Sequence, residues 1–210
     1  MYNPKLGVLC SALTSVEAAK GSFSGYMAAQ KSSSERVTIR AARTVGKARR
    51  PVQINGGRKV TRREAREHCF KMLFCQDFYP ADEKEEQLER YFEAPKEDVT
   101  GEDGKDEILH DPFEKEEDRA YLEKRVEKIM ELIPEIDEKI NEIAEGWRTR
   151  RMGKVELTIL RLAVFEMKYD EEIPEKVAIN EAVELAKKFG GDEAPAFVNG
   201  ILAKLIQKGN

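Results

Sequence analysis

The sequence has few of the residues from which most metal sites and disulfides are built. Its 210 residues include only three cysteines (Cys10, Cys69 and Cys75) and two histidines (His68 and His110). The cysteines are odd in number and follow no disulfide or zinc spacing, and the histidines are too far apart in sequence to complete a metal site. We therefore expect no metal or other cofactor, and a reducing, cytoplasmic compartment.

Long apolar runs and catalytic motifs are also missing. No apolar run reaches the length of about 18 residues that a membrane-spanning helix needs. The sequence has no glycine-rich phosphate loop ahead of a helix, no nucleophile elbow and no cysteine–histidine pair at ligand spacing. Its many carboxylates stand beside lysines on helical faces, which is the ordinary pattern of a solvated surface. We predict a protein that is not an enzyme and has no membrane contact.

Charge is distributed unevenly along the chain. Residues 1–60 hold eleven basic and two acidic residues, a net charge of +9, whereas the rest of the chain has a net charge of −13. The first segment is rich in small and polar residues without periodicity, so we predict a disordered basic extension over residues 1–59. It could be an arm that contacts RNA, an organellar targeting peptide, or upstream sequence outside the native protein, which we favour because helical order begins abruptly near Val60.

From residue 60 onward the apolar residues recur with helical periodicity, and residues 60–210 are predicted to form an all-α domain. Its central helix is Val155–Met167, which is apolar nearly all round and therefore belongs inside a bundle. Pro134 is expected to end one helix and begin the next. Residues 94–115, charged and rich in Pro, Gly and Asp, are expected to form a long, mobile loop rather than strands. The seven helices are expected at about 61–78, 83–92, 122–133, 134–147, 155–169, 174–189 and 192–206.

The first of these helices carries the most informative polar pattern. Arg62, Arg66, Phe70 and Phe74 are spaced four apart and form one row along its surface. Within the helix, Arg62 and Arg66 lack a carboxylate partner, whereas Arg63 has one a turn later. Guanidinium groups bind phosphates and exposed rings stack on bases, so the row predicts a surface for single-stranded RNA. The alternative is that both phenylalanines belong to the core and the arginines merely face solvent.

Three other positions depart from the pattern of their helices. Glu156 and Arg161 interrupt the apolar central helix and could form a buried polar network or the edge of a protein interface. Gly200 costs helix stability, about 1 kcal/mol relative to alanine, and suggests a close approach between helices.

Three blocks of the sequence resemble the NusB family of transcription antitermination factors. They are TRREAREHCFKMLF (61–74), VELTILRLAVFEMKY (155–169) and VAINEAVELAKKFGGDEAPAFVNGIL (177–202), and the resemblance covers residues 60–207 in order. It implies an all-α fold of two small helical subdomains without catalytic activity. It also implies binding to boxA RNA of nascent ribosomal RNA transcripts with NusE, the small-subunit ribosomal protein, in an antitermination complex on RNA polymerase.

The resemblance also implies which residues bind RNA. The family's arginine-rich first helix falls on Arg62, Arg63 and Arg66, and family aromatic positions fall on Phe74 and Phe197. Two departures make the RNA surface less basic than in some relatives. Glu64 stands where some relatives have an arginine, and Ala196, just before Phe197, stands where some relatives have a lysine.

Two acidic residues match positions associated with the protein partner. Glu156 falls on the NusE-binding side and Glu193 on the nearby edge of the RNA surface.

Two alternatives to this function stay open. One is a pure protein-interaction bundle, such as a homodimer that buries a spare face of the central helix. The other is the RNA-binding domain of a cytosine-5 rRNA methyltransferase, whose N-terminal part resembles NusB. The second predicts a Rossmann-type catalytic domain downstream, whereas this sequence ends at Asn210, just after the last helix.

Overall fold

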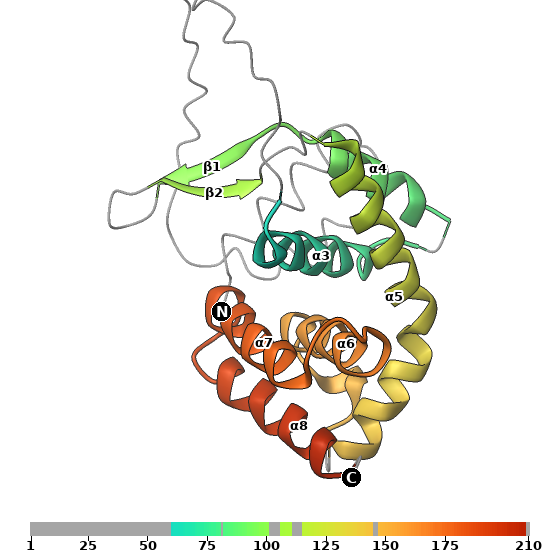
Figure 1. Cartoon of the computed structure of the whole chain (residues 1–210), viewed down its shortest axis with the longest axis vertical. Helices are drawn as coiled ribbons and strands as arrows, with labels where there is room; N and C mark the ends of the chain where they lie inside the picture. Colours follow the sequence, from blue (N-terminus) through green and yellow to red (C-terminus); the bar gives the residue numbers. More distant parts are fainter. Residues whose placement is uncertain (1–59, 81, 101–105, 111–114, 145–146, 209–210) are drawn as a thin grey trace, which may run out of the picture.

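The computed structural model describes residues 60–80, 82–100, 106–110, 115–144 and 147–208 (Figure 1). The expectation of a disordered basic extension over residues 1–59 lies outside this part of the chain. The elements in chain order are α3 (Arg62–Gln76), α4 (Lys84–Glu93), β1 (Glu97–Thr100), β2 (Asp106–His110), α5 (Glu116–Ile143), the 3-10 turn η1 (Thr149–Arg151), α6 (Lys154–Tyr169), α7 (Glu175–Phe189) and α8 (Ala194–Lys208).

The helices form two groups joined by α5, which confirms the all-α class and the two small subdomains. Figure 1 shows α3 and α4 on one side, α6, α7 and α8 on the other, and α5 running along both. Among the described helices, none has the length and apolar character that a bilayer span requires.

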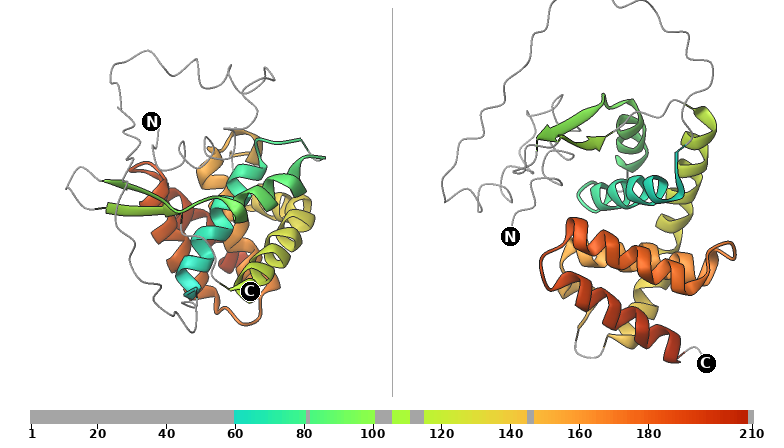
Figure 2. Two further views of the ribbon diagram at one scale, coloured as in Figure 1. Left: turned by 90° about the horizontal axis from the view of Figure 1, so that it is seen from above. Right: turned by 60° about the vertical axis from the view of Figure 1, so that its left-hand side comes forward.

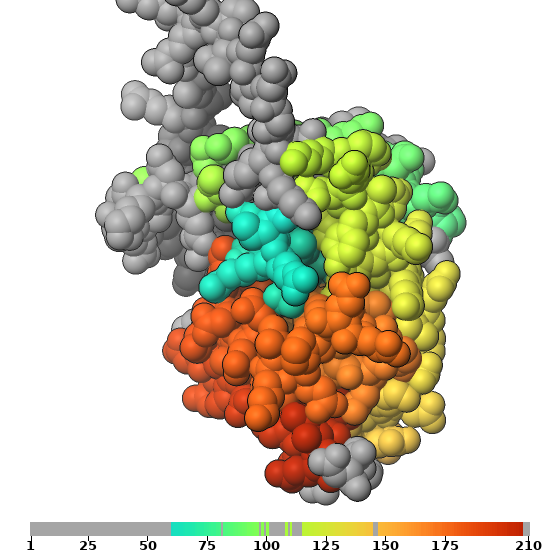
Figure 3. All heavy atoms as spheres, viewed as in Figure 1, coloured from blue at the N-terminus to red at the C-terminus, as the bar shows by residue number. Residues whose placement is uncertain are grey.

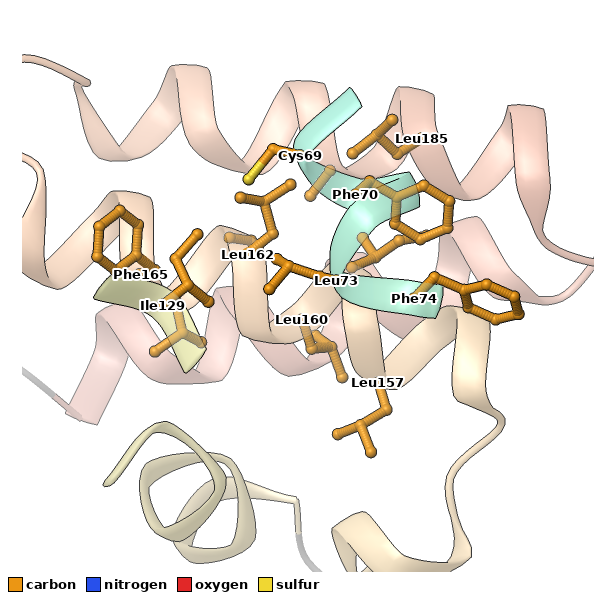
Figure 4. Packing of buried hydrophobic residues seen from close by; sticks show 14 of the residues in the cluster. Cys69, Phe70, Leu73, Phe74, Ile129, Leu157, Leu160, Leu162, Phe165 and Leu185 are labelled. Atoms are coloured by element: carbon orange, nitrogen blue, oxygen red, sulfur yellow. The ribbon is translucent and has the colours of Figure 1, made fainter. Parts of the chain in front are cut away.

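Helix α6 is the centre of the bundle, as its apolar sequence predicts. It packs against α3, α5, α7 and α8. Figure 4 shows Leu162 of α6 beside Leu73 of α3, within the same buried cluster as Ile129 of α5. Each fully buried aliphatic side chain of this kind contributes about 1.5–3 kcal/mol relative to an exposed one. Because four helices surround α6, the spare face on which a homodimer was predicted to form is covered by the described residues.

Helix α5 is continuous where a break was predicted. It runs through Pro134, so the described part of the chain has six α-helices rather than seven. Proline removes one backbone hydrogen bond and usually kinks or breaks a helix. Here the residues before Pro134 (Leu122, Val126 and Ile129) and those after it (Ile136, Ile140 and Ile143) are all buried in one core. We infer that this shared burial outweighs the lost hydrogen bond.

A small β-hairpin lies where a loop was predicted. Strands β1 and β2 pair antiparallel, with Asp98 opposite Ile108 and Val99 opposite Glu107. The prediction of a loop without strands over residues 94–115 is therefore wrong for these nine residues. Figure 2 shows the hairpin at the α3–α4 end of the molecule, away from α8. Its last residue, His110, is buried and contacts the ring of Tyr91 in α4, which gives the hairpin a hydrophobic anchor.

Gly200 does not mark a close approach between helices. A Cβ atom added at this position would have no neighbour within 4 Å, and the residue is exposed on α8. The prediction from its sequence is therefore wrong, and the structure offers no packing reason for this glycine.

Candidate nucleic-acid interface

The first turn of α3 is held by a capping box. The hydroxyl Oγ1 of Thr61 accepts a hydrogen bond from the backbone N–H of Glu64 at 3.2 Å, and the Glu64 carboxylate accepts one from the backbone N–H of Thr61 at 2.9 Å. This reciprocal pair satisfies two backbone donors that a helix start otherwise leaves free. It also fixes the turn that carries Arg62 and Arg63, so Glu64 has a structural role at the edge of this surface.

Arg62 and Arg63 are the accessible guanidinium groups of α3. Arg62 is exposed and forms no ion pair with any described residue. The Arg63 side chain is 61% exposed and lies 3.7 Å from the carboxylate of Glu184, a long and solvent-exposed contact. Figure 3 shows the start of α3 at the surface, between α5 and α7. These two arginines are available to phosphate groups, because such exposed pairs are weak.

Arg66 was predicted to be an exposed, unpaired guanidinium, but it is buried and paired. Its side chain is only 8% exposed, and its Nε lies 2.9 and 3.0 Å from the two carboxylate oxygens of Glu166. Its Nη1 donates to Glu181 at 3.2 Å. The expectation that Arg62 and Arg66 form an unpaired row is therefore wrong for Arg66. The reason is tertiary: α6 and α7 bring carboxylates to a helix face that carries no partner of its own.

A second arginine completes this buried network. Arg125 of α5 donates from Nη2 to Glu166 at 2.8 Å and from Nη1 to Asp170 at 2.5 Å. The network thus joins α3, α5, α6 and α7. It forms one wall of a cavity of about 360 Å³, whose lining also includes Arg62 and Tyr121. Sequence reasoning did not identify Arg125 or Asp170, because their partners lie on other helices and no local spacing indicates them.

Phe74 is also buried, together with Phe70. The two side chains are 8% and 0% exposed, and their ring centroids are 6.0 Å apart. Phe78 adds an edge contact to Phe74 at 5.1 Å (Figure 4 shows the packing of Phe70 and Phe74). The alternative that both phenylalanines belong to the core is confirmed, and neither ring face is open to a base in this structure.

Phe197 lies far along the chain from α3, in the first turns of α8. It is half-buried and packs against the core. Its ring makes an edge contact with Trp147 at a centroid distance of 5.7 Å. Trp147 is 55% exposed, so an aromatic surface does exist here, and it includes a residue outside the predicted site.

The two predicted partner residues lie at the starts of different helices. The half-buried Glu156 carboxylate folds over the first turn of α6, since a Cβ atom added at Gly153 would clash with its Oε2. A carboxylate at this position interacts favourably with the helix dipole. Glu193 is exposed just before α8, and its carbonyl accepts a hydrogen bond from the N–H of Phe197 at 3.0 Å.

Arg161 resolves the two interpretations of the polar residues on the central helix. It donates to both carboxylate oxygens of Asp137 at 2.8 Å and to those of Asp77 at 3.0 and 3.2 Å. The buried-network interpretation is therefore confirmed for Arg161. Its guanidinium joins α6 to α5 and to the end of α3, a bidentate geometry that lysine cannot reproduce.

The two histidines come together beneath the hairpin. The rings of His68 and His110 have centroids 5.9 Å apart, and His68 Nδ1 lies 2.7 Å from the hydroxyl of Tyr91. Burial lowers the pKa of His68 to about 3, and burial raises the pKa of the adjacent Cys69 thiol to about 12. No group of three His, Cys, Asp or Glu side chains among the described residues could hold a metal.

Comparison with known proteins places this chain among functionally described relatives. The family model described as the NusB family matches residues 63–207. The transcription antitermination protein NusB of Lachnoclostridium phytofermentans is 48% identical over 147 residues, which cover 70% of this chain and 99% of the relative.

Two solved structures share the fold. The NusB structure of T. maritima is 28% identical with a TM-score of 0.58, covering 72% of this chain and 94% of that chain. A chain from the crystal structure of antitermination factors NusB and NusE in complex with dsRNA is 24% identical with a TM-score of 0.52. It covers 70% of this chain and 96% of that chain.

Proposed function

This chain belongs to the NusB family, and from that premise we propose that it is a transcription antitermination factor that binds boxA RNA of nascent ribosomal RNA transcripts together with NusE. The observation that carries the proposal is the 48% identity to a transcription antitermination protein over nearly all of that relative's length. Antitermination of this kind is a binding function and not a reaction catalysed by the chain, in agreement with the prediction that it is not an enzyme.

Fewer arginines of α3 are available to bind RNA than the sequence predicts. Arg62 and Arg63 are exposed at the start of α3, whereas Arg66 is committed to Glu166 and Glu181. The helix start adds its own positive end, which favours anions. We propose that Arg62 and Arg63 contact phosphate groups, and that Arg66 holds the helix that carries them.

A partner protein explains how such a small basic surface suffices. Residues 61–210 have a net charge of −13, which repels phosphate at long range. If NusE binds beside this surface, each protein supplies part of the contacts, and the second contact gains from high effective concentration. We propose that Glu156 and Glu193 lie on or near the NusE-facing side. The complex then tethers boxA RNA to elongating RNA polymerase in the cytoplasm.

A gel-shift measurement with boxA RNA tests this function. The full chain is titrated against labelled boxA RNA with and without purified NusE, beside the variant Arg62→Ala/Arg63→Ala. Wild type is expected to bind, more tightly with NusE, and the variant is expected to bind more weakly in both series. A matched control is Lys124→Ala/Lys176→Ala, which removes the same charge from exposed positions on α5 and α7.

Two outcomes would contradict the proposal. Absence of binding in both series would remove the RNA function itself. Equal losses in the arginine variant and the lysine control would show that net charge matters, and that the start of α3 does not form the contact.

A further inference from the structure

We infer that Trp147, Arg148, Arg150 and Arg151, here called the η1 patch, form a second contact surface for single-stranded RNA. The inference rests on the proposed function and extends it to residues that the sequence analysis left unassigned. The patch lies in the connection between α5 and α6. Its members are all exposed, and Trp147 is one of only a few large hydrophobic side chains exposed among the described residues.

The turn that carries the patch is held firmly by one buried residue. The backbone N–H of Thr149 donates to Oδ1 of Asn141 at 2.8 Å, and Nδ2 of Asn141 donates to the Thr149 hydroxyl at 3.1 Å. Thr149 is itself buried. Because Thr149 points inward and is tied to α5, its neighbours Arg148 and Arg150 are left exposed on the surface. The guanidinium groups are thus presented from a fixed backbone.

The three arginines have no acidic partner in the described part of the chain. No ion pair or side-chain hydrogen bond is formed there by Arg148, Arg150 or Arg151. This contrasts with Arg66, Arg125 and Arg161, which are all held by carboxylates. On a body with a net charge of −13, these three arginines, for which the described residues offer no acidic partner, form a local positive site. Glu193, one turn before Phe197, is also exposed, just before α8.

The aromatic part of the patch favours a nucleic acid over a simple anion. Phe197 supports the Trp147 ring edge-on at 70° and 5.7 Å, so a large indole is held at the surface rather than folded into the core. An exposed ring beside guanidinium groups is the arrangement that binds single strands, because bases stack on the ring while phosphates meet the charges.

The η1 patch and the start of α3 lie at opposite ends of α6. The patch precedes the first residue of α6, whereas Arg66, one turn after Arg62, pairs with Glu166 near the last turn. Helix α6 has 16 residues, which correspond to about 24 Å at 1.5 Å per residue. The two clusters therefore contact different nucleotides, and one strand that engages both gains affinity from the linkage.

Trp147 provides a direct test, because it is the single tryptophan of the chain. A short fluorescein-labelled single-stranded boxA RNA is used for anisotropy, and the unlabelled RNA is used to follow tryptophan emission of the full chain. Stacking is expected to quench the emission at the concentrations at which the RNA binds. The variant Trp147→Ala is expected to bind about fivefold to a hundredfold more weakly, the range for loss of one stacked base. Trp147→Phe, which keeps a ring, is expected to retain most of the affinity.

The charges are tested with Arg148→Ala/Arg150→Ala/Arg151→Ala. The slope of log affinity against log salt is expected to fall by about 0.7 for each phosphate that the variant no longer neutralises, up to about 2 for the three arginines. Lys96→Ala/Lys124→Ala/Lys176→Ala is the matched control, since it removes three exposed positive charges elsewhere. Its RNA affinity and salt slope are expected to stay close to those of wild type.

The outcomes separate this inference from the proposed function. RNA that binds without altering tryptophan emission, and equally well to the triple arginine variant (here called the η1 variant), overturns the patch and leaves the function standing. Loss of NusE binding alone in the η1 variant, measured with NusE in the absence of RNA, shows that the patch is a protein interface and also overturns the inference. No RNA binding by wild type, with or without NusE, removes both.

Discussion

Arg66 and Glu166, one hundred residues apart in sequence, form a buried ion pair in which Nε lies 2.9 Å from Oε1. The Arg66 side chain is 8% exposed and the Glu166 side chain is 2% exposed. It connects α3, which begins with the proposed RNA-binding arginines, to the central helix α6. Arg66 therefore contributes to the surface by fixing the position of α3, while the contact with RNA is left to Arg62 and Arg63.

We expect Arg66→Ala to destabilise the fold strongly. The substitution removes one of the two arginines that hold the buried Glu166 carboxylate and leaves Arg125 as its partner. A buried charge left without any partner costs about 3–5 kcal/mol, so with Arg125 retained we expect a loss of about 2–3 kcal/mol. Urea denaturation followed by circular dichroism measures the change in the free energy of unfolding. Arg62→Ala is the control, because substitution of an exposed residue that has no ion pair with the described residues changes stability by no more than about 0.5 kcal/mol. Similar stabilities for the two variants would refute the structural role of Arg66.

The salt dependence of RNA affinity distinguishes Arg62 from Arg63. Arg62 has no acidic partner among the described residues, whereas Arg63 lies 3.7 Å from Glu184. We expect Arg62→Ala to reduce the slope of log affinity against log salt by about 0.7, the contribution of one phosphate on a single strand. Arg63→Ala is expected to have a smaller effect, because part of its charge is already balanced. Fluorescence anisotropy over a salt series measures both, and a larger effect at Arg63 would contradict this order.

The buried His68 makes stability depend on pH. Burial lowers its pKa from 6.5 to about 3 in the folded protein. The unfolded chain therefore binds a proton at pH values at which the folded chain does not, and stability falls as pH decreases from about 6.5 towards 3. As the pH falls from about 7.5 to about 5, His68 should lower the free energy of unfolding by about 2 kcal/mol.

The comparison variant for this effect is His68→Asn, which keeps an acceptor for the Tyr91 hydroxyl but does not titrate. Urea titrations at several pH values should show a flatter pH profile for the variant than for wild type over this range, whatever its absolute stability. Parallel profiles would mean that the pKa of His68 is the same in the folded and the unfolded chain.

Cys69 should be chemically inert while the protein is folded. The thiol is fully buried, and burial raises its pKa to about 12, so almost no thiolate is present near neutral pH. We expect iodoacetamide to label the peptide that contains Cys69 only when the protein unfolds. Mass spectrometry of digested samples, labelled with and without urea, measures this. Rapid labelling without denaturant would indicate that α3 opens locally.

Much of the fold follows from the periodicity of apolar residues. The central position of α6 could be predicted because residues such as Leu160 and Leu162 leave no polar face between Val155 and Met167. The continuity of α5 could not, because the local effect of Pro134 is to break a helix, and only the burial of residues on both sides outweighs it. The hairpin was missed for a similar reason, since its charged strands have little apolar alternation and depend on contacts such as that of His110 with Tyr91.

The sequence by itself determined the helical class, the limits of most helices and the family, because helix periodicity and family motifs are local in the chain. Only the tertiary structure decided which arginines are held by carboxylates of other helices. The pairs of Arg66 with Glu181 and of Arg125 with Glu166 join residues 115 and 41 positions apart. Local spacing shows that a guanidinium lacks a neighbour on its own helix, but packing of other helices decides whether a carboxylate reaches it. For that reason Arg66 is structural, whereas Arg62 and the arginines of the η1 patch remain exposed.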